Sequence, residues 1–323
     1  GKTYPLYRVE VESWTQTDGQ EKRVQTETLW CDGVGKIWKR YASLLEMTQW
    51  RMSPAEIETY FQQKEATVEM GTVDFAQKWS VPVDWKGREP DFSAQKILRY
   101  QVYFQTPYSQ DDVPFQNSAF QQIRLLDEQT AEITVWASDE PLPWKVVSPV
   151  TERDENPNSL IQSDAPEVVA LARLAVGEET EPRKQAFLLE NFVYRYISDK
   201  NYAQGFMTAA EVVKHPSGDC TEHAVLLAAL LRAEKIPARI VQGLVYDRGT
   251  RAFVWHVWNE AWLGVFWQPL DATLGRGVVG ADHIRMNAGD FDSQTMAQTL
   301  LPAAQLIGKI RLEQSFSEGE GQP

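Results

Sequence analysis

The sequence predicts an α+β protein in which a β-rich N-terminal domain precedes a domain that combines helices with an antiparallel sheet. Residues 4–138 repeatedly alternate apolar and polar side chains, which is the period of a strand with one buried face. Residues 166–174 and 183–196 instead place their apolar side chains at helical spacing. Beyond them, a capped helix precedes three runs of strand character that end at residue 271.

The domain boundary is expected where prolines gather with polar residues in the string PVTERDENPNS, a composition typical of a linker. This divides the chain into a β-rich domain (1–150), a linker (151–165), a second domain (166–312) and a frayed tail (313–323). One helix is expected to interrupt the β-rich domain at residues 53–63, because a serine cap, a proline and a glutamate stand there in the order of a capping box. A protein partner bound through the N-terminal domain is one candidate for its role.

The composition excludes several classes of protein. Lys and Arg number 32 against 45 Asp and Glu, and the resulting net charge of −13 disfavours binding to nucleic acid. The longest apolar run, residues 224–231, is far shorter than the roughly 20 residues that cross a bilayer, so no transmembrane segment is expected. The first residues lack the features of a signal peptide, but a mature exported protein would lack them too, so that localisation stays open.

Cys220 stands at the predicted start of a helix. Asp219 and Glu222 have the spacing of a reciprocal cap, and the apolar run AVLLAALL follows them. A thiol at the first helical position lies at the positive end of the helix dipole, which favours the nucleophilic thiolate, although the two neighbouring carboxylates oppose it. We therefore predict that the thiol of Cys220 has a low pKa. Cys31, the only other cysteine, is not expected to have one.

Three strands of an antiparallel meander are expected after this helix, at residues 238–246, 251–262 and 266–271. His256 lies on the middle strand, and Asp271 ends the third. If the connecting loop is effectively two residues, or three with a bulge, the two side chains share one face and lie opposite or diagonal to each other. The sequence therefore predicts contact between an imidazole and a carboxylate.

Cys220, His256 and Asp271 together supply the parts of thiol catalysis. They are a nucleophile at a helix N-terminus, a base, and a carboxylate that fixes the tautomer of the base. Trp258 and neighbouring tryptophans are expected to exclude water from them.

The string GDCTEHAVLLAALLRAEKIPARIVQGLVY, followed by WHVWNEAWLGVFWQPLDATLG, resembles the core of the transglutaminase-like superfamily in its bacterial branch. The resemblance covers residues 166–310 and does not extend over 1–150. It implies a papain-like α+β fold and an acyl-thioester intermediate on Cys220, with His256 and Asp271 completing a triad. It implies no metal or organic cofactor.

The resemblance also bears on substrate and location. Many bacterial members are proteases or amidases, often exported, which predicts a thiol-dependent hydrolase of peptides or proteins and favours an exported or periplasmic location. Animal members instead cross-link glutamine to lysine, so acyl transfer to an amine is one alternative, and a non-catalytic binding or scaffold role is another. Thr221 stands where animal enzymes have an aromatic residue, and no position matches their distant tryptophan. Oxyanion donors beyond the Cys220 backbone N–H are therefore left open.

Three further residues are candidates for a supporting role, and each also has a structural interpretation. His223 shares a helix face with Cys220 and is either packed against the meander or part of a zinc site with Cys220, His256 and Asp271. Glu260 shares the face of His256, where a salt bridge explains it equally well. Trp258 is expected in a wall or core position. His215 and His283 show no partner pattern and are expected in surface or loop positions.

Overall fold

The computed structural model describes the ranges 5–17, 20–42, 47–51, 80–109, 113–137, 148–199, 207–289, 291–292 and 308–315, together with Ala303 and Leu306. The chain divides into two compact units, residues 1–71 and 72–323. Its mixture of sheet and helix confirms the α+β class. The helix expected at residues 53–63 lies outside the described residues.

The first unit contains a four-stranded antiparallel sheet in the order β1-β2-β3-β4 among its described residues. Its strands are β1 (Tyr7–Thr17), β2 (Gln20–Cys31), β3 (Ile37–Ala42) and β4 (Met47–Trp50). Asp32 shapes the turn after β2, because its carboxylate accepts the backbone N–H of Val34 and Lys36 at 3.1 and 2.9 Å. The alternation of side chains in this part of the sequence thus corresponds to strands.

The second unit contains a larger sheet, whose described strands run in the order β12-β9-β10-β5-β13-β6-β8-β7, with β11 beside β10. The early strands are β5 (Ser80–Asp84), β6 (Ile97–Phe104), β7 (Gln121–Asp127) and β8 (Thr130–Trp136). The later ones are β9 (Ala238–Asp247), β10 (Ala252–Trp262), β11 (Trp267–Leu270), β12 (His283–Gly289) and β13 (Ile310–Ser315).

This sheet explains why the division differs from the expected linker at 151–165. β5 pairs with β10 through Pro82 and Ala252, so strands from both sides of the expected boundary belong to one sheet. They also share one core, in which Tyr100 of β6 packs edge-on against Phe253 of β10 at 5.3 Å between ring centroids. A boundary at 151–165 would separate these strands and expose that core. The two compact units therefore meet between residues 71 and 72 in the sequence, not at the expected linker.

The tail also differs from expectation. Residues 313–315 were expected to be frayed, but they belong to β13, which pairs with β6 and β5. Leu312 is buried, and Glu313 forms an ion pair with Lys86 at 2.6 Å, so residues 313–315 are part of the sheet.

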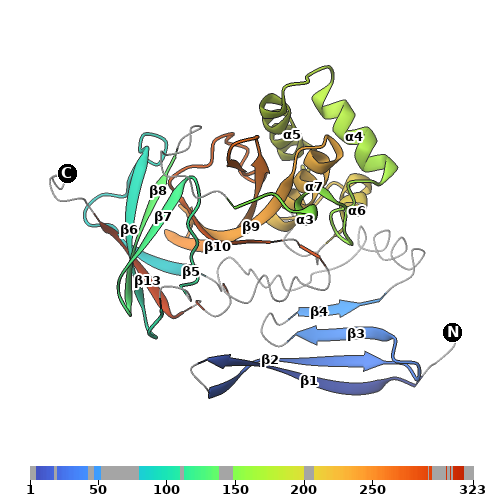
Figure 1. Ribbon diagram of the computed structural model, residues 1–323, viewed down its shortest axis with the longest axis horizontal. Helices are drawn as coiled ribbons and strands as arrows, with labels where there is room; N and C mark the ends of the chain where they lie inside the picture. Colours follow the sequence, from blue (N-terminus) through green and yellow to red (C-terminus); the bar gives the residue numbers. More distant parts are fainter. Residues whose placement is uncertain are drawn as a thin grey trace. The chain divides into compact units, whose positions relative to one another are not determined.

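Helices cover the part of the sheet formed by β9 and β10 (Figure 1). They are α3 (Glu152–Glu155), α4 (Pro166–Val176), α5 (Pro182–Tyr196), α6 (Ala209–Lys214) and α7 (Cys220–Ala233). α4 and α5 confirm the helical spacing seen in the sequence, and α3 lies within the expected linker. α4, α5 and α6 pack against α7, which in turn packs on β9 and β10. Among the described residues, no helix is long and apolar enough to cross a membrane.

Candidate active site

The N-terminus of α7 carries the expected reciprocal cap. The Asp219 carboxylate accepts the backbone N–H of Thr221 at 2.8 Å, and the Glu222 carboxylate accepts the backbone N–H of Asp219 at 3.0 Å. Gly218 has a φ of 147°, and a Cβ there would lie 2.4 Å from Cγ of Glu222, so this position requires glycine. Cys220 is consequently fixed as the first residue of the helix.

Cys220 reaches β10 at a gap in its outer edge. On that edge β5 pairs with β10 as far as Val254, and β11 pairs with it from Asn259 onward. Next to this gap, the backbone N–H of Val257 lies close enough to Cys220 to act on the pKa of its thiol. Nδ2 of Asn259 donates to the backbone carbonyl of Ala224 at 2.9 Å and holds α7 against the strand. The nucleophile candidate therefore lies beside the residue that follows His256.

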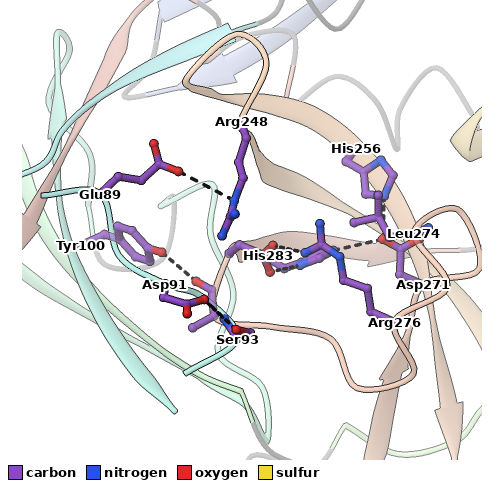
Figure 2. A network of polar contacts seen from close by, with 12 residues as sticks. Glu89, Asp91, Ser93, Tyr100, Arg248, His256, Asp271, Leu274, Arg276 and His283 are labelled. Atoms are coloured by element: carbon purple, nitrogen blue, oxygen red, sulfur yellow. Dashed lines mark hydrogen bonds and ion pairs between the residues drawn. The ribbon is translucent and has the colours of Figure 1, made fainter. Parts of the chain in front are cut away.

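His256 and Asp271 are in direct contact, as the strand register predicts. Nε2 of His256 lies 2.9 Å from Oδ2 of Asp271, and both side chains are buried (Figure 2). Trp262 pairs with Trp267 across the loop, so that a continued strand would place Asp271 diagonal to His256 on the same face. Because Nε2 faces the carboxylate, Nδ1 is the ring nitrogen left to act as a base.

The other oxygen of Asp271 is held by the backbone. Oδ1 accepts the N–H of Thr273 at 2.8 Å and of Leu274 at 3.3 Å, so the turn that follows β11 fixes the carboxylate plane. Nearby, Gly275 has a φ of 60°, and a Cβ at this position would lie 2.4 Å from the Tyr194 ring of α5. The turn is thus packed closely against a helix.

His283 is a third member of this cluster, and its expected surface or loop position is wrong. It begins β12 and is buried, with Nε2 at 3.1 Å from Oδ2 of Asp271 and Nδ1 at 2.8 Å from Oδ1 of Asp282 (Figure 2). Arg276 then binds the other oxygen of Asp282 at 2.6 Å. The alternation of polar His283 and Arg285 with apolar neighbours was a sequence signal for this strand.

The charges in the cluster follow from these contacts. Burial raises the pKa of Asp271, but the charges and N–H groups of His256 and His283 outweigh it and hold that pKa well below its usual range. Burial lowers the pKa of His283, but the charges and hydrogen bonds of Asp282 and Asp271 outweigh burial and raise that pKa from 6.5 to about 9. The pKa of Asp282 falls to about 2, since His283 and Arg276 overcome its burial. At neutral pH the cluster therefore contains an imidazolium between two carboxylates.

The Cys220 thiol departs from the low pKa predicted for it. Burial raises the pKa of Cys220 well above its usual range, and the charges of Asp219, Glu222 and Asp271 raise it further. The N–H of Val257 acts in the opposite direction but is outweighed. In these surroundings the thiol is neutral at pH 7, and its ionisation needs a base that accepts the proton.

The three candidate supporting residues occupy different surroundings. Nδ1 of His223 lies 2.6 Å from the backbone carbonyl of Asp219, inside the first turn of α7. Trp258 stacks on His256 with ring centroids 6.2 Å apart, and so covers the imidazole. Glu260 is buried and forms ion pairs with Arg239 and Arg285.

Two arginines surround Glu260. Its carboxylate accepts Nε of Arg239 at 2.7 Å and Nε of Arg285 at 2.9 Å. Burial raises the pKa of Glu260, but the charges of Arg285 and Arg239 outweigh it and lower the pKa overall. The salt-bridge interpretation of Glu260 fits this geometry.

A metal could be held by a group other than the predicted zinc set. Among the described residues, His256, Asp271 and His283 have ligand atoms that all lie within 4.8 Å of one another. This group shares His256 and Asp271 with the predicted set but contains neither Cys220 nor His223. In the structure, Nε2 of His256 and Nε2 of His283 both point at Oδ2 of Asp271, at hydrogen-bond distance.

Comparison with known proteins agrees with this architecture. Residues 169–272 match the family model of the transglutaminase-like superfamily, so this segment is a transglutaminase-like core. The matched segment begins in α4 and ends directly after Asp271, and it therefore contains Cys220 and His256. No curated protein matches the chain.

Two of the solved structures that this chain matches are described here. One is described as a candidate cysteine protease from Cytophaga hutchinsonii, at 15% identity over 70% of this chain and 90% of that chain, with a TM-score of 0.42. The other is the periplasmic domain of TgpA from Pseudomonas aeruginosa bound to ethylmercury, at 17% identity over 69% of this chain and 95% of that chain, with a TM-score of 0.34.

Proposed function

We propose that this protein is a thiol-dependent hydrolase, a cysteine protease or amidase that cleaves amide bonds of peptides or proteins. Cys220 is the nucleophile, His256 the base and Asp271 the carboxylate that orients the base. One observation carries the proposal: the buried contact between His256 and Asp271 adjoins the point where the capped Cys220 meets β10. The transglutaminase-like core in the same segment supports it.

The surroundings of Cys220 favour proton transfer during attack rather than a thiolate formed beforehand. Nδ1 of His256 takes the thiol proton while the sulfur bonds to the carbonyl carbon of the substrate. The backbone N–H of Cys220, at the helix N-terminus, is placed to stabilise the negative oxygen. The imidazolium of His256 then donates its proton to the departing amine as the C–N bond breaks.

Hydrolysis of the thioester completes the cycle. His256 takes a proton from a water molecule, whose oxygen attacks the acyl carbon. The C–S bond breaks, the acid leaves, and the sulfur regains its proton from the imidazolium. Throughout both halves, Asp271 holds the ring through Nε2 and stabilises its positive form.

Alkylation with iodoacetamide tests the nucleophile without a known substrate. Peptide mapping after limited labelling near neutral pH should find Cys220 modified well before Cys31, because only Cys220 has an adjacent base. His256→Ala should slow the labelling of Cys220, whereas His223→Ala, a histidine on the same helix, should leave most of it. Equal labelling of both cysteines, or loss of labelling in His223→Ala with the fold intact, would contradict the assignment.

A casein digest with and without a fluorescent primary amine tests the reaction class. Hydrolysis predicts new peptide termini that depend on Cys220 and little amine incorporation. Incorporation of the amine into glutamine side chains, without cleavage, would instead identify the protein-glutamine acyltransferase alternative. If the protein neither cleaves casein nor incorporates the amine, and if its Cys220 is not selectively alkylated, the binding or scaffold alternative is favoured. Exported location stays a prediction.

A further inference from the structure

We propose that His256, Asp271 and His283 bind a divalent transition-metal ion, with Zn²⁺ the best match to their donor atoms, and that the bound ion inhibits the candidate active site. The metal site rests on geometry alone, and only the inhibition rests on the proposed function. The match to the family model ends at residue 272, so it does not include His283.

Three donor atoms converge at Oδ2 of Asp271. Nε2 of His256 lies 2.9 Å from this oxygen, and Nε2 of His283, on a different strand, lies 3.1 Å from it (Figure 2). Among the described residues, these three side chains place their ligand atoms within 4.8 Å of one another. Ligands bound to Zn²⁺ at about 2.0 to 2.2 Å stand roughly 3.3 to 3.5 Å apart in a tetrahedron, so shifts of a few tenths of an ångström at each contact with Oδ2 would admit the ion.

The sheet brings the two histidines together from strands that are not neighbours. β9 lies between β10 and β12, and Gly243 of β9 stands opposite His256. A Cβ at Gly243 would lie 2.5 Å from the Trp258 ring, so glycine makes room for this indole. Trp258 stacks on His256 at 6.2 Å and meets His283 edge-on at 5.3 Å, measured between ring centroids. The two imidazoles are therefore held with their ring centroids 6.0 Å apart.

The groups around the ligands match the outer layer of known metal sites. A histidine ligand typically donates its second ring N–H to a carboxylate, which fixes the ring, and carboxylate ligands are themselves hydrogen-bonded. Nδ1 of His283 faces Oδ1 of Asp282 at 2.8 Å, and Arg276 holds the other oxygen of Asp282 at 2.6 Å. Oδ1 of Asp271 accepts two backbone N–H groups of the turn after β11, which leaves Oδ2 as the ligand atom. This outer layer points to a metal independently of the three donor atoms.

The donor set favours Zn²⁺ over cations that bind oxygen. Imidazole nitrogen suits zinc and other transition metals, whereas Mg²⁺ and Ca²⁺ prefer carboxylate, carbonyl and water oxygens. Two histidines and one carboxylate, with a water in the fourth position, are a common coordination of zinc. Cys220 and His223 do not belong to the group, so this site differs from the zinc set considered in the sequence.

Metal binding and the proposed reaction exclude each other. Asp271 orients His256 through the contact between Oδ2 and Nε2, and an ion would replace this hydrogen bond by coordination bonds. The reaction also requires His256 to become an imidazolium, which has no nitrogen lone pair left for a metal. The bound ion is therefore expected to be a reversible inhibitor that competes for the base and not for the substrate.

Zinc binding is measured on the full chain after metal removal with EDTA and dialysis. Equilibrium dialysis against Zn²⁺, followed by metal analysis, should find one equivalent bound, whereas Mg²⁺ under the same conditions should not bind. His283→Gln should lose this equivalent, because it removes a nitrogen ligand. His215→Gln, the same substitution in the C-terminal cap of α6, is the matched control and should keep it.

Asp282→Asn tests the outer layer and guards against a His283 variant that does not fold. It leaves all three ligands in place but weakens the hold on His283, so the dissociation constant of Zn²⁺ should rise by about 10- to 100-fold. Co²⁺ in place of Zn²⁺ reports the ligands of the wild-type protein by absorption. Visible bands without the near-ultraviolet charge-transfer band of a cobalt–thiolate bond are expected. Circular dichroism checks the folding of each variant.

Inhibition is measured as the rate at which iodoacetamide labels Cys220. Zn²⁺ at about ten times its dissociation constant should slow the labelling of wild-type protein by about ten-fold, because about one molecule in ten stays metal-free. Excess EDTA should restore the rate. For His283→Gln, the rate with the same Zn²⁺ concentration is compared with that variant's own metal-free rate, and the two should be nearly equal.

Several results would overturn the inference. If no zinc binds, or if His283→Gln keeps the bound equivalent, these residues are not the metal site. A cobalt–thiolate band would make Cys220 a ligand and define a different site. Zinc bound at the site without slower labelling would refute the inhibition. Failure of the proposed function looks different, because Cys220 of the metal-free wild type would then react no faster than Cys31, while zinc would still bind and be lost in His283→Gln.

Discussion

Substitution of Glu190 by glutamine should stabilise the folded protein above neutral pH and have little effect in acid. Glu190 lies on α5 at 2% exposure, and its Oε1 accepts the backbone N–H of Gly277 at 3.2 Å. Burial raises the pKa of Glu190 from 4.5 to about 7; the N–H of Gly277 opposes this, and the charge of Asp271 adds to it. Glutamine keeps an oxygen for that N–H but carries no charge at any pH.

The magnitude follows from proton linkage. The folded chain holds a proton at Glu190 between pH 4.5 and about 7 where the unfolded chain has released it, so stability falls as pH rises through this window. A difference of 7 − 4.5, at about 1.4 kcal/mol for each pH unit, corresponds to about 3 kcal/mol lost when Glu190 ionises. Glu190→Gln avoids this loss.

Urea unfolding followed by tryptophan fluorescence measures the effect at about pH 5 and about pH 8. The variant should match the wild type within about 1 kcal/mol at the lower pH and exceed it by about 3 kcal/mol at the higher one. Glu167→Gln is the matched control, because a backbone hydrogen bond at the start of α4 and Lys214 lower the pKa of Glu167. An equal stability difference for Glu190→Gln at both pH values would refute the reasoning.

Three further predictions concern the proposed triad, the buried ion pairs of Glu260, and the close approach of Gly243 to β12. Asp271→Asn should keep the ring oriented without its charge and lower kcat/KM by ten- to a thousand-fold, about 1.4 to 4 kcal/mol, measured on any amide substrate found. Glu260→Gln should lower the free energy of unfolding by about 3 to 5 kcal/mol in urea, because it leaves Arg239 and Arg285 buried without a counter-charge. Gly243→Ala should lower the thermal midpoint, since its Cβ would lie 2.1 Å from a backbone oxygen of β12.

The parts of the site that the sequence predicted correctly are those set by short-range geometry. The cap around Cys220 depends on residues within one helical turn. The contact of His256 with Asp271 depends on one tight loop, whose closing hydrogen bond from Leu263 to Phe266 makes it effectively two residues long. With that length the side chains on the two strands stay in phase, so a pattern with a period of two residues suffices.

The parts that differed depend on pairing between distant segments. His283 reaches Asp271 because β12 pairs with β9 and not with its neighbour in sequence, and a shift of register follows Arg285. The boundary between the two compact units, at residues 71/72, depends on the pairing of β5 with β10 and β13. No local sequence pattern predicts this pairing. The raised pKa of the Cys220 thiol results from burial and from several nearby charges. Their net effect depends on the positions of these groups in space, which the sequence does not give.

The topology of β10 explains why the catalytic candidates meet at one place. A strand with partners along its full length offers no backbone N–H to a neighbour, but the outer edge of β10 is shared by β5 and β11 with an interval between them. Val257 lies in this interval, its backbone N–H lowers the pKa of the nearby Cys220 thiol, and His256 is its chain neighbour. The end of β11 at Leu270 delivers Asp271 to the same interval. A β11 lengthened by two residues would pair with Trp258 and Val257 and narrow this interval, so the early end of β11 at Leu270 keeps the edge of β10 open beside His256.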